Sequence, residues 1–347
     1  MKNRLVRELE TMQAALMDAE GAVELAALCL QVRAKSGALM PLVANRAQRE
    51  FEARRGVENI VLKARQMGMS TWVAGRFLLK TILVPGSTTL LVAHTREASE
   101  MLFTTVARMW ENLPTLLRDG IGQRGRSNVG QITFPAVDSE FRVASAADPN
   151  AGRGLTVHNL HCSEVARWGG DAADTLAGLR AALAPGGELV LESTPKGAYG
   201  GFHAQWQAAE SEGMVRHFFP WWMEPAYVGT PVAEMTAEEE ALARRAGLTA
   251  EQVGFRRELA RRFGPMRSQE FAEDAVSCFR ASGACFFERE VVAARLEDLP
   301  PVMERRMDGA LRVWLPPVRG RRYVMAADAA GGGSAGDFAA VQAIDEA

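Results

Sequence analysis

Hydrophobic and polar residues follow two different patterns along the 347 residues of this chain. Over residues 1–34 the apolar positions recur every three or four residues, the spacing of an amphipathic helix, and predict two helices before Gly37. From residue 58 onward, short apolar runs alternate with helical patterns. The chain therefore begins with a helical segment and continues into a region of mixed strands and helices.

Six short apolar runs predict buried strands, and two longer patterns between them predict helices. The predicted strands cover residues 58–64, 88–93, 131–134, 141–144, 155–161 and 188–192, and the helices cover 72–83 and 96–112. Strands that alternate with helices are typical of a mostly parallel, doubly wound α/β sheet, whose ligands bind at the carboxyl ends of the strands. We therefore expect the functional residues at those ends.

Beyond residue 200 the predicted strands become sparse. The aromatic cluster 217–227 precedes two helices, each with a capping-box pair at its start, and we interpret this region as a helical lid. A proline-rich stretch then leads to a strand at 323–327 and a glycine-rich turn, where a second domain begins. The expected boundaries are 1–40 for the N-terminal helical segment, 41–205 for the core, 206–298 for the lid, 299–321 for a linker and 322–347 for the start of the second domain.

Composition excludes several classes of protein. With 48% hydrophobic and 24% charged residues the chain is neither disordered nor fibrous, and its formal net charge of −2 means that any DNA contact must be a local patch. Its four cysteines form no C-x-x-C pair, which argues against a zinc site and favours a reducing cytosol. No run approaches the length of a membrane span and no signal peptide is evident, so we expect a cytoplasmic protein without a membrane partner.

Lysine is rare in this chain. Of 40 Lys and Arg residues only five are Lys, which leaves 35 Arg. GC-rich codon usage would produce this bias, and so would selection for the guanidinium fork, which binds phosphate through two hydrogen bonds. Composition alone leaves both explanations open.

One of the five lysines lies in the most informative loop. Between the strand 58–64 and the helix 72–83 the sequence reads KARQMGMST. A standard phosphate-binding loop is G-x-x-x-x-G-K-[ST]; here Met69 takes the place of the lysine, and Lys63 stands at the other end of the loop with Arg65 nearby. A loop that curls around phosphates brings both of its ends near the same oxygens. The alternative is a strand that happens to end in basic residues before a helix cap.

The pattern K-x-R-Q-x-G-x-S-T resembles the deviant Walker A motif of the large terminase subunits of tailed double-stranded DNA phages, which are ATP-driven packaging motors. The resemblance runs from about residue 45 to the end of the chain. It implies a P-loop ATPase of the ASCE type, with ATP and Mg²⁺ as cofactors. Gln48 would read the adenine and Ser70 would hold Mg²⁺. The nucleotide-binding residues would be Lys63, Ala64, Arg65, Gln66, Met67, Gly68, Met69, Ser70 and Thr71.

The same resemblance assigns the catalytic residues. The strand 155–161 runs into C-S-E-V-A-R-W, which places Glu164 as the Walker B carboxylate that activates water, while Ser163 stands where the family has an Asp that binds Mg²⁺. Ser193 and Thr194 match the coupling motif that reports hydrolysis to the lid. Arg153 is a candidate arginine finger for a neighbouring subunit, although an ordinary surface role is equally open for it.

The C-terminal region resembles the first strand and turn of the family's RNase H-like nuclease domain. Asp328, at the end of the strand, would be one ligand of a two-metal site holding Mg²⁺ or Mn²⁺, and Asp337 at most a supporting residue. The strands that would bring the other carboxylates are not in this sequence. We therefore expect that the chain does not cut DNA by itself.

Together with these patterns, the resemblance implies an ATP-hydrolysing motor that moves viral double-stranded DNA into a procapsid. The resemblance implies a homo-oligomeric ring on the portal protein, a small terminase subunit as partner, and a location in the host cytoplasm with transient docking on procapsids. Candidate DNA contacts are Arg124, Arg126 and the Arg-rich stretch 256–262, which are equally compatible with a solvated surface. Two alternatives stay open: a helicase-like remodelling ATPase, and a nucleotide-binding assembly protein that has lost catalysis.

Overall fold

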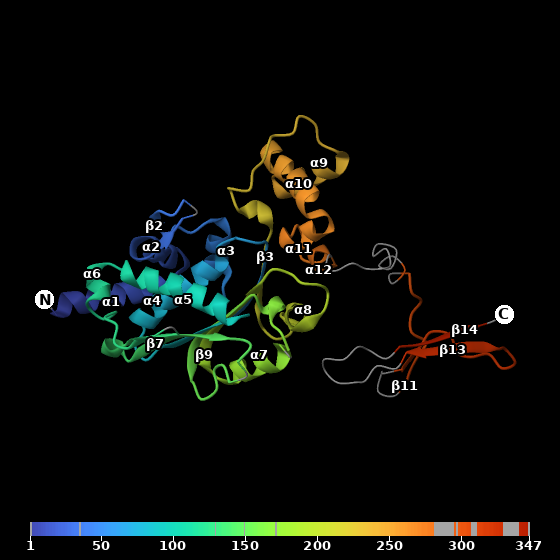
Figure 1. Cartoon of the computed structure of the whole chain (residues 1–347), viewed down its shortest axis with the longest axis horizontal. Coiled ribbons are helices and arrows are strands. Elements are labelled where there is room, and N and C mark those ends of the chain that lie inside the picture. The colour runs from blue at the N-terminus through green and yellow to red at the C-terminus, as the bar shows by residue number, and fades with distance from the viewer. Residues whose placement is uncertain are drawn as a thin grey trace. The chain divides into compact units, whose positions relative to one another are not determined.

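A computed structural model describes residues 2–34, 36–128, 130–148, 150–170, 172–280, 295, 298–306, 311–328 and 340–345. The chain divides into two compact units, Met1–Ser282 and Gly283–Ala347. The first unit is an α/β domain built around one large sheet (Figure 1). The α/β class expected from the sequence is confirmed.

The sheet of the first unit has the strand order β10-β3-β9-β8-β4-β7-β6-β5. Neighbouring strands are parallel from β10 to β7, and β6 and β5 continue the sheet antiparallel. The strands are β3 (Glu58–Lys63), β4 (Thr88–Ala93), β5 (Ser127–Asn128), β6 (Gln131–Phe134), β7 (Ser139–Ser145), β8 (Val157–Ser163), β9 (Leu183–Ser193) and β10 (Val215–Phe219). All six predicted strands are present. In space, β9 lies between β3 and β8, although it follows both of them in sequence.

Helices cover both faces of this sheet (Figure 1). One face packs against α2 (Ala19–Cys29), α3 (Arg46–Arg54), α4 (Met69–Leu83) and α5 (Arg96–Glu111), with α1 (Lys2–Met17) and the short α6 (Thr115–Arg118) joining the same core. The other face packs against α7 (Ala172–Ala181) and α8 (Gly200–Ala208). Because the central strands are covered on both sides, they are apolar at consecutive positions instead of alternating positions.

Strand β3 illustrates how this core positions the site. Val61 points into the cluster under α4, while Ile60 and Leu62 point into the cluster under α7 and α8, and all three are fully buried. Each such side chain contributes roughly 1.5–3 kcal/mol of hydrophobic stabilisation. The strand is thereby fixed on both faces, and its polar continuation at Lys63 emerges at the carboxyl edge of the sheet.

The N-terminal segment differs from the expectation in one respect. The two predicted helices are present, but the second ends at Cys29 and is followed by an antiparallel hairpin of β1 (Gln31–Arg33) and β2 (Leu39–Pro41). Gly37 lies in the connecting turn with a φ of 88°, a backbone conformation that glycine adopts without strain. The helical reading of residues 30–34 is therefore wrong.

The sequence analysis also missed a strand in the aromatic cluster. β10 pairs in parallel with β3 and forms the edge of the sheet, so residues 215–219 belong to the sheet and not to a lid. Burial alternates along it, with His217 and Phe219 buried and Phe218 half-buried on the other face, but the three consecutive aromatic residues hide this alternation in the sequence.

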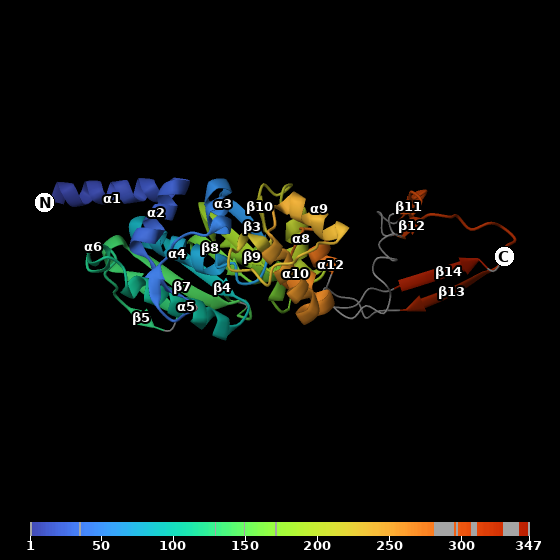
Figure 2. The same cartoon turned by 90° about the horizontal axis from the view of Figure 1, so that it is seen from above.

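A helical segment follows β10 and contains α9 (Ala237–Ala246), α10 (Ala250–Phe263), α11 (Arg267–Glu270) and α12 (Ser277–Arg280) (Figure 2). Both predicted capping boxes are formed, at Thr236 with Glu239 and at Thr249 with Gln252. The backbone N–H of Arg65, just after β3, donates to the carbonyl of Glu270 at 2.9 Å, which joins this helical segment to the carboxyl edge of the sheet. Short 3₁₀ turns occur at η1 (Pro135–Val137), η2 (Val165–Arg167), η3 (Trp221–Met223) and η4 (Gly264–Met266).

The described part of the second unit consists mainly of paired strands. β11 (Glu304–Arg306) pairs with β12 (Leu311–Val313), and β13 (Tyr323–Asp328) pairs antiparallel with β14 (Ala340–Asp345). The strand predicted at 323–327 is confirmed, and Asp328 is its last residue, opposite Ala340. Asp337 lies outside the described residues.

No helix in the described ranges is both long enough and apolar enough to cross a membrane.

Candidate active site

The loop between β3 and α4 has a backbone that restricts which residues it accepts. Gln66 has a φ of 56° and Gly68 a φ of 71°, so both adopt the left-handed conformation. A Cβ at Gly68 would lie 2.9 Å from Gln48 Nε2, closer than a real Cβ contact allows. The left-handed backbone favours glycine at position 68, and a larger residue would also have to displace the amide of Gln48.

The same loop presents unused backbone donors at the start of α4. Within the described chain, the backbone N–H groups of residues 66–71 donate no hydrogen bond, because they lie in the loop and in the first turn of the helix. The carbonyls of Met67 and Gly68 accept from Asn45 Nδ2 and Gln48 Nε2, at 3.0 Å each. The free N–H groups and the helix dipole together make this end of α4 suitable for binding an anion.

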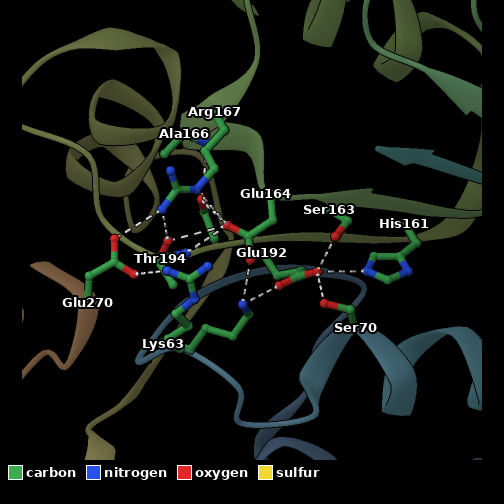
Figure 3. Close-up of polar contacts among 12 residues, drawn as sticks. Lys63, Ser70, His161, Ser163, Glu164, Ala166, Arg167, Glu192, Thr194 and Glu270 are labelled. Atoms are coloured by element: carbon green, nitrogen blue, oxygen red, sulfur yellow. Dashed lines mark hydrogen bonds and ion pairs between the residues drawn. The ribbon is translucent and has the colours of Figure 1, made fainter. Parts of the chain in front are cut away.

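Lys63, the last residue of β3, lies between two carboxylates (Figure 3). Its Nζ is 2.9 Å from Glu164 Oε1 and 3.0 Å from Glu192 Oε2. Burial opposes the ammonium form, but the charges of Glu192 and Glu164 outweigh it and hold the pKa of Lys63 above its ordinary value. Lys63 is therefore a cation at this edge of the sheet, as the phosphate-loop interpretation requires.

Glu192 is the centre of this cluster, and the sequence analysis did not identify it. It is fully buried near the end of β9, and its Oε1 accepts from Ser70 Oγ and from Ser163 Oγ, both at 2.6 Å, while His161 Nε2 lies 3.4 Å away. Burial raises the pKa of this carboxyl, but Lys63 and His161 more than offset that effect and hold the pKa well below its usual range. The signal was present in the sequence: an acidic residue closes the apolar run of β9, directly before Ser193.

Glu164 follows β8 in a left-handed conformation, with a φ of 52°, which turns its side chain toward the loop. Its Oε2 accepts from Ser193 Oγ at 3.4 Å and from Thr194 Oγ1 at 3.3 Å. Arg167 Nε lies 3.7 Å from the same oxygen. The structure thus brings the predicted catalytic carboxylate and the predicted coupling residues into contact, and adds Arg167, which the sequence analysis did not consider.

A second ionic group connects the loop to the helical segment (Figure 3). Glu270 of α11 accepts from Arg65 Nη1 at 2.9 Å through one oxygen and from Arg167 Nη2 at 3.3 Å through the other. Tyr227 Oη donates to the carbonyl of Arg65 at 2.8 Å. Arg167 also lies beside Glu164. Through Glu270 the helical segment therefore contacts both the phosphate loop, at Arg65, and the neighbour of the predicted catalytic carboxylate, Arg167.

Two predicted nucleotide-binding residues have structural contacts here. Gln48 is buried, donates to Gly68 and accepts from the backbone N–H of Asn45 at 2.9 Å, which completes the capping box of α3. The backbone N–H of Ala64 donates to the carbonyl of Phe219 in β10. Gln48 therefore supports the loop directly, and its adenine-reading role stays a prediction.

Arg153 is the one predicted catalytic residue that the structure does not bring to the cluster. It is exposed in the connection that precedes β8, whereas Glu164 follows the opposite end of that strand. Seven strand residues span about 20 Å. Arg153 thus lies before the strand that Glu164 follows, and its expected role toward a neighbouring subunit stays a prediction.

The arginines proposed to contact DNA separate into two groups. Arg124 stacks over the Trp110 ring at 4.3 Å and is exposed, as is Arg126. Within the stretch 256–262, Arg256 is buried against Glu273, with Nε 2.9 Å from Oε1, so its selection as a DNA contact was wrong. Arg257 is engaged by Glu239, while Arg261 and Arg262 are exposed.

The donor set at the carboxyl edge fits a magnesium ion. Ser70 Oγ and Ser163 Oγ both donate to the Glu192 carboxylate, which brings three side chains with hard oxygen atoms together, and Mg²⁺ is usually held by one or two carboxylates together with substrate phosphates and water. No group of three or more His, Cys, Asp and Glu side chains suited to a metal occurs among the described residues.

No protein-family model matches this sequence, and no curated protein matches it. Among solved structures, the chain is similar to the large terminase of bacteriophage HK97, with 17% sequence identity and a TM-score of 0.54 over 94% of this chain and 67% of that one. It also matches the large terminase ATPase domain of Thermus phage P74-26, with 18% identity and a TM-score of 0.44 over 67% of this chain and 94% of that chain.

The HK97 likeness is one of fold. It extends over nearly the whole chain and agrees with the α/β architecture that the sequence predicted. The solved structure is of a protein from the group that the loop and strand-end motifs resemble.

Proposed function

We propose that this chain is the ATPase of a viral DNA-packaging motor of the large-terminase kind. The observation that carries the proposal is the contact of 2.9 Å between Lys63 and Glu164, which are 101 residues apart in sequence. A loop lysine and a strand-end carboxylate that meet beside free helix N–H groups are the arrangement that phosphoryl transfer to water requires. The terminase fold supports the proposal without specifying the chemistry.

In this proposal each residue of the cluster has a distinct task. Lys63 exchanges its carboxylate contacts for phosphate oxygens, and the N–H groups at the start of α4 hold the phosphates. Ser70 would hold Mg²⁺, which neutralises charge on the phosphates when bound. Glu164 orients the attacking water, and its contacts with Ser193 and Thr194 make those residues sensitive to its position.

The link to the helical segment supports a motor and not a simple hydrolase. Glu270 bonds to Arg65 in the phosphate loop and to Arg167 beside Glu164. A change in either arginine on hydrolysis would alter the attachment of α11. We infer that this is how the nucleotide state reaches the helical segment, which would then act on DNA.

The wider proposal concerns partners. The motor would act as a homo-oligomeric ring on the portal of a procapsid, together with a small terminase subunit, with Arg153 offered to the neighbouring subunit and double-stranded DNA bound through phosphate contacts. Asp328, at the end of β13, would serve a nuclease domain with its own Mg²⁺ or Mn²⁺ pair. A helicase-like remodelling ATPase and a nucleotide-binding protein without catalysis are the competing functions.

The test compares ATP turnover by the wild type and by Glu164→Gln, each with and without double-stranded DNA. We expect hydrolysis by the wild type that DNA stimulates, and a loss of about 100-fold or more in Glu164→Gln because the carboxamide cannot accept the proton of water. Glu140→Gln, on the distant strand β7, is the matched control and should leave turnover unchanged. Equal rates in the wild type and Glu164→Gln would contradict the catalytic assignment, and nucleotide binding without turnover would favour the catalytically inactive protein.

A further inference from the structure

Ser163 leaves the proposed Mg²⁺ site without the carboxylate that phosphate-loop enzymes use. In such enzymes Mg²⁺ is held by the loop Ser or Thr and by an Asp at the end of the Walker B strand. Here that strand is β8, and Ser163 occupies the Asp position. On the proposed function the site needs a carboxylate from elsewhere.

Glu192 lies where that carboxylate is needed. β9 is the neighbour of β8, and the register pairs Ser163 directly with Glu192. Adjacent strands are about 4.8 Å apart, and a Glu side chain is one methylene longer than an Asp. Glu192 therefore reaches from the next strand toward the space in front of Ser163, and its contact of 2.6 Å with Ser163 Oγ follows from this placement.

Ser70, the predicted Mg²⁺ ligand of the loop, also contacts Glu192. Its hydroxyl donates to Glu192 Oε1 at 2.6 Å, so its proton is directed toward the carboxylate and its lone pairs remain for a cation. Glu192 Oε2 is buried and makes only the ion pair with Lys63, without a hydrogen bond of good geometry among the described residues. The carboxylate thus has capacity for another cationic partner beside the metal-binding hydroxyl.

The charges around Glu192 indicate which kind of cation would be its further partner. The cations Lys63, Arg65 and Arg167 are balanced by the carboxylates Glu164, Glu192 and Glu270, so the cluster has no excess positive charge to offer a triphosphate. Burial strengthens the repulsion between these carboxylates and phosphate. A divalent cation that arrives with the nucleotide reverses this repulsion, whereas lysine alone does not.

We propose that Glu192 is the carboxylate of the Mg²⁺–nucleotide site, supplied from β9 in place of the Asp that β8 lacks. The competing explanation is that Glu192 serves only as the buried counterion of Lys63. The two explanations differ in their dependence on metal: a counterion affects nucleotide binding equally with and without Mg²⁺, whereas a metal-site residue affects only the part that Mg²⁺ contributes.

The test measures equilibrium affinity of the full chain for a fluorescent, non-hydrolysable ATP analogue, in saturating Mg²⁺ and in EDTA. We expect Mg²⁺ to tighten binding by the wild type at least tenfold, and Glu192→Gln to reduce this gain by about tenfold while binding in EDTA is equal or tighter, because one negative charge is gone. In the double variant Ser163→Asp/Glu192→Gln, which returns the carboxylate to β8, the gain should reappear.

Two further variants keep the test decisive. Glu188→Gln is the matched control, because it removes a buried carboxylate of the same strand that pairs with Arg76 and Lys80, away from the loop. It should keep the wild-type ratio of the two affinities. Glu192→Asp preserves the charge opposite Lys63 and protects folding, and its shorter side chain should still reduce the ratio.

The outcomes separate this inference from the proposed function. A wild-type ratio in folded Glu192→Gln or Glu192→Asp would overturn the inference, as would an equal loss of affinity with and without Mg²⁺. If the wild type binds no nucleotide in either condition, the proposed function itself fails. A ratio reduced in Glu192→Gln and kept in Glu188→Gln supports both.

Discussion

Lys63 shows how much of this site depends on one residue. It is almost fully buried, and its Nζ bridges Glu164 of the β8 edge and Glu192 of β9. Breaking a buried ion pair by removing one partner typically costs about 3–5 kcal/mol of folding stability. The same lysine thus supports the fold and, in the proposed function, the phosphates of ATP.

At the residue scale we predict two effects of Lys63→Ala. The free energy of unfolding should fall by about 3–5 kcal/mol in urea denaturation, because the buried Glu192 carboxylate loses its ion pair with the Lys63 ammonium. Affinity for ATP should fall by about 10- to 100-fold under conditions where the variant is folded, the usual worth of a hydrogen bond to a charged group.

Lys80→Ala is the control for this prediction. Lys80 lies on α4 and pairs with Glu188 at 2.9 Å, away from the loop, so its loss should reduce stability without changing ATP affinity. Folded Lys63→Ala that binds ATP as tightly as the wild type would mean that the displaced-lysine interpretation of the loop is wrong.

At the scale of elements, β10 is the strand that the sequence analysis missed, and its burial has a measurable consequence. His217 lies fully buried on β10, with its ring 5.0 Å from that of Phe51 and its Nε2 3.1 Å from Asn59 Oδ1. Burial, with a smaller contribution from the charge of Arg54, lowers the pKa of His217 to about 4. The edge of the sheet therefore packs best around a neutral imidazole.

This pKa predicts how stability depends on pH. The folded pKa of His217 is below its ordinary value of 6.5, so the unfolded chain binds more protons between these values and stability rises with pH. Lowering the pH from about 6.5 to about 4.5 should cost about 2–3 kcal/mol through this residue. Urea denaturation of the wild type and of His217→Gln at several pH values measures the difference, and parallel curves for the two proteins would contradict the prediction.

For the molecule as a whole, the near-neutral net charge means that the proposed DNA binding would have to rest on local arginines. Arg261 and Arg262 are exposed at the end of α10, whereas Arg256 of the same helix is buried in an ion pair with Glu273. Contacts to phosphate release condensed counterions, so the affinity falls steeply with salt. Within the stretch 256–262, Arg261 and Arg262 are therefore the remaining candidates for contact with DNA phosphates.

We predict that the affinity for double-stranded DNA declines linearly with salt on logarithmic axes, and that Arg261→Ala/Arg262→Ala reduces the slope by about one for each lost phosphate contact. Fluorescence anisotropy with a labelled duplex gives the slope. Arg96→Ala is the control. Arg96 is exposed and pairs with Glu100, and both residues lie on α5, a different helix from α10. An unchanged slope in the double variant would exclude this end of α10 as a DNA contact.

Much of the fold could be predicted from the sequence because its signals are local. The strand 88–93 was placed at its observed bounds, since a continuous apolar run between polar turns has few other solutions. The helices α9 and α10 were placed by their capping boxes, which act within four residues. β10 was missed because a short aromatic strand at a sheet edge carries no such local signal, and only its pairing with β3 defines it.

The candidate site divides in the same way. The sequence by itself determined that a lysine opens the loop, that a glycine permits its turn and that Glu164 ends a buried strand, because each of these depends on residues adjacent in the chain. Only the tertiary structure decided that Glu192 lies between Lys63, Ser70 and Ser163. The order of strands in a sheet differs from their order in the chain. β9 lies between β3 and β8 in the sheet, although it begins only at Leu183, well after β8 ends at Ser163. The chemistry of the site is therefore set by which strands become neighbours.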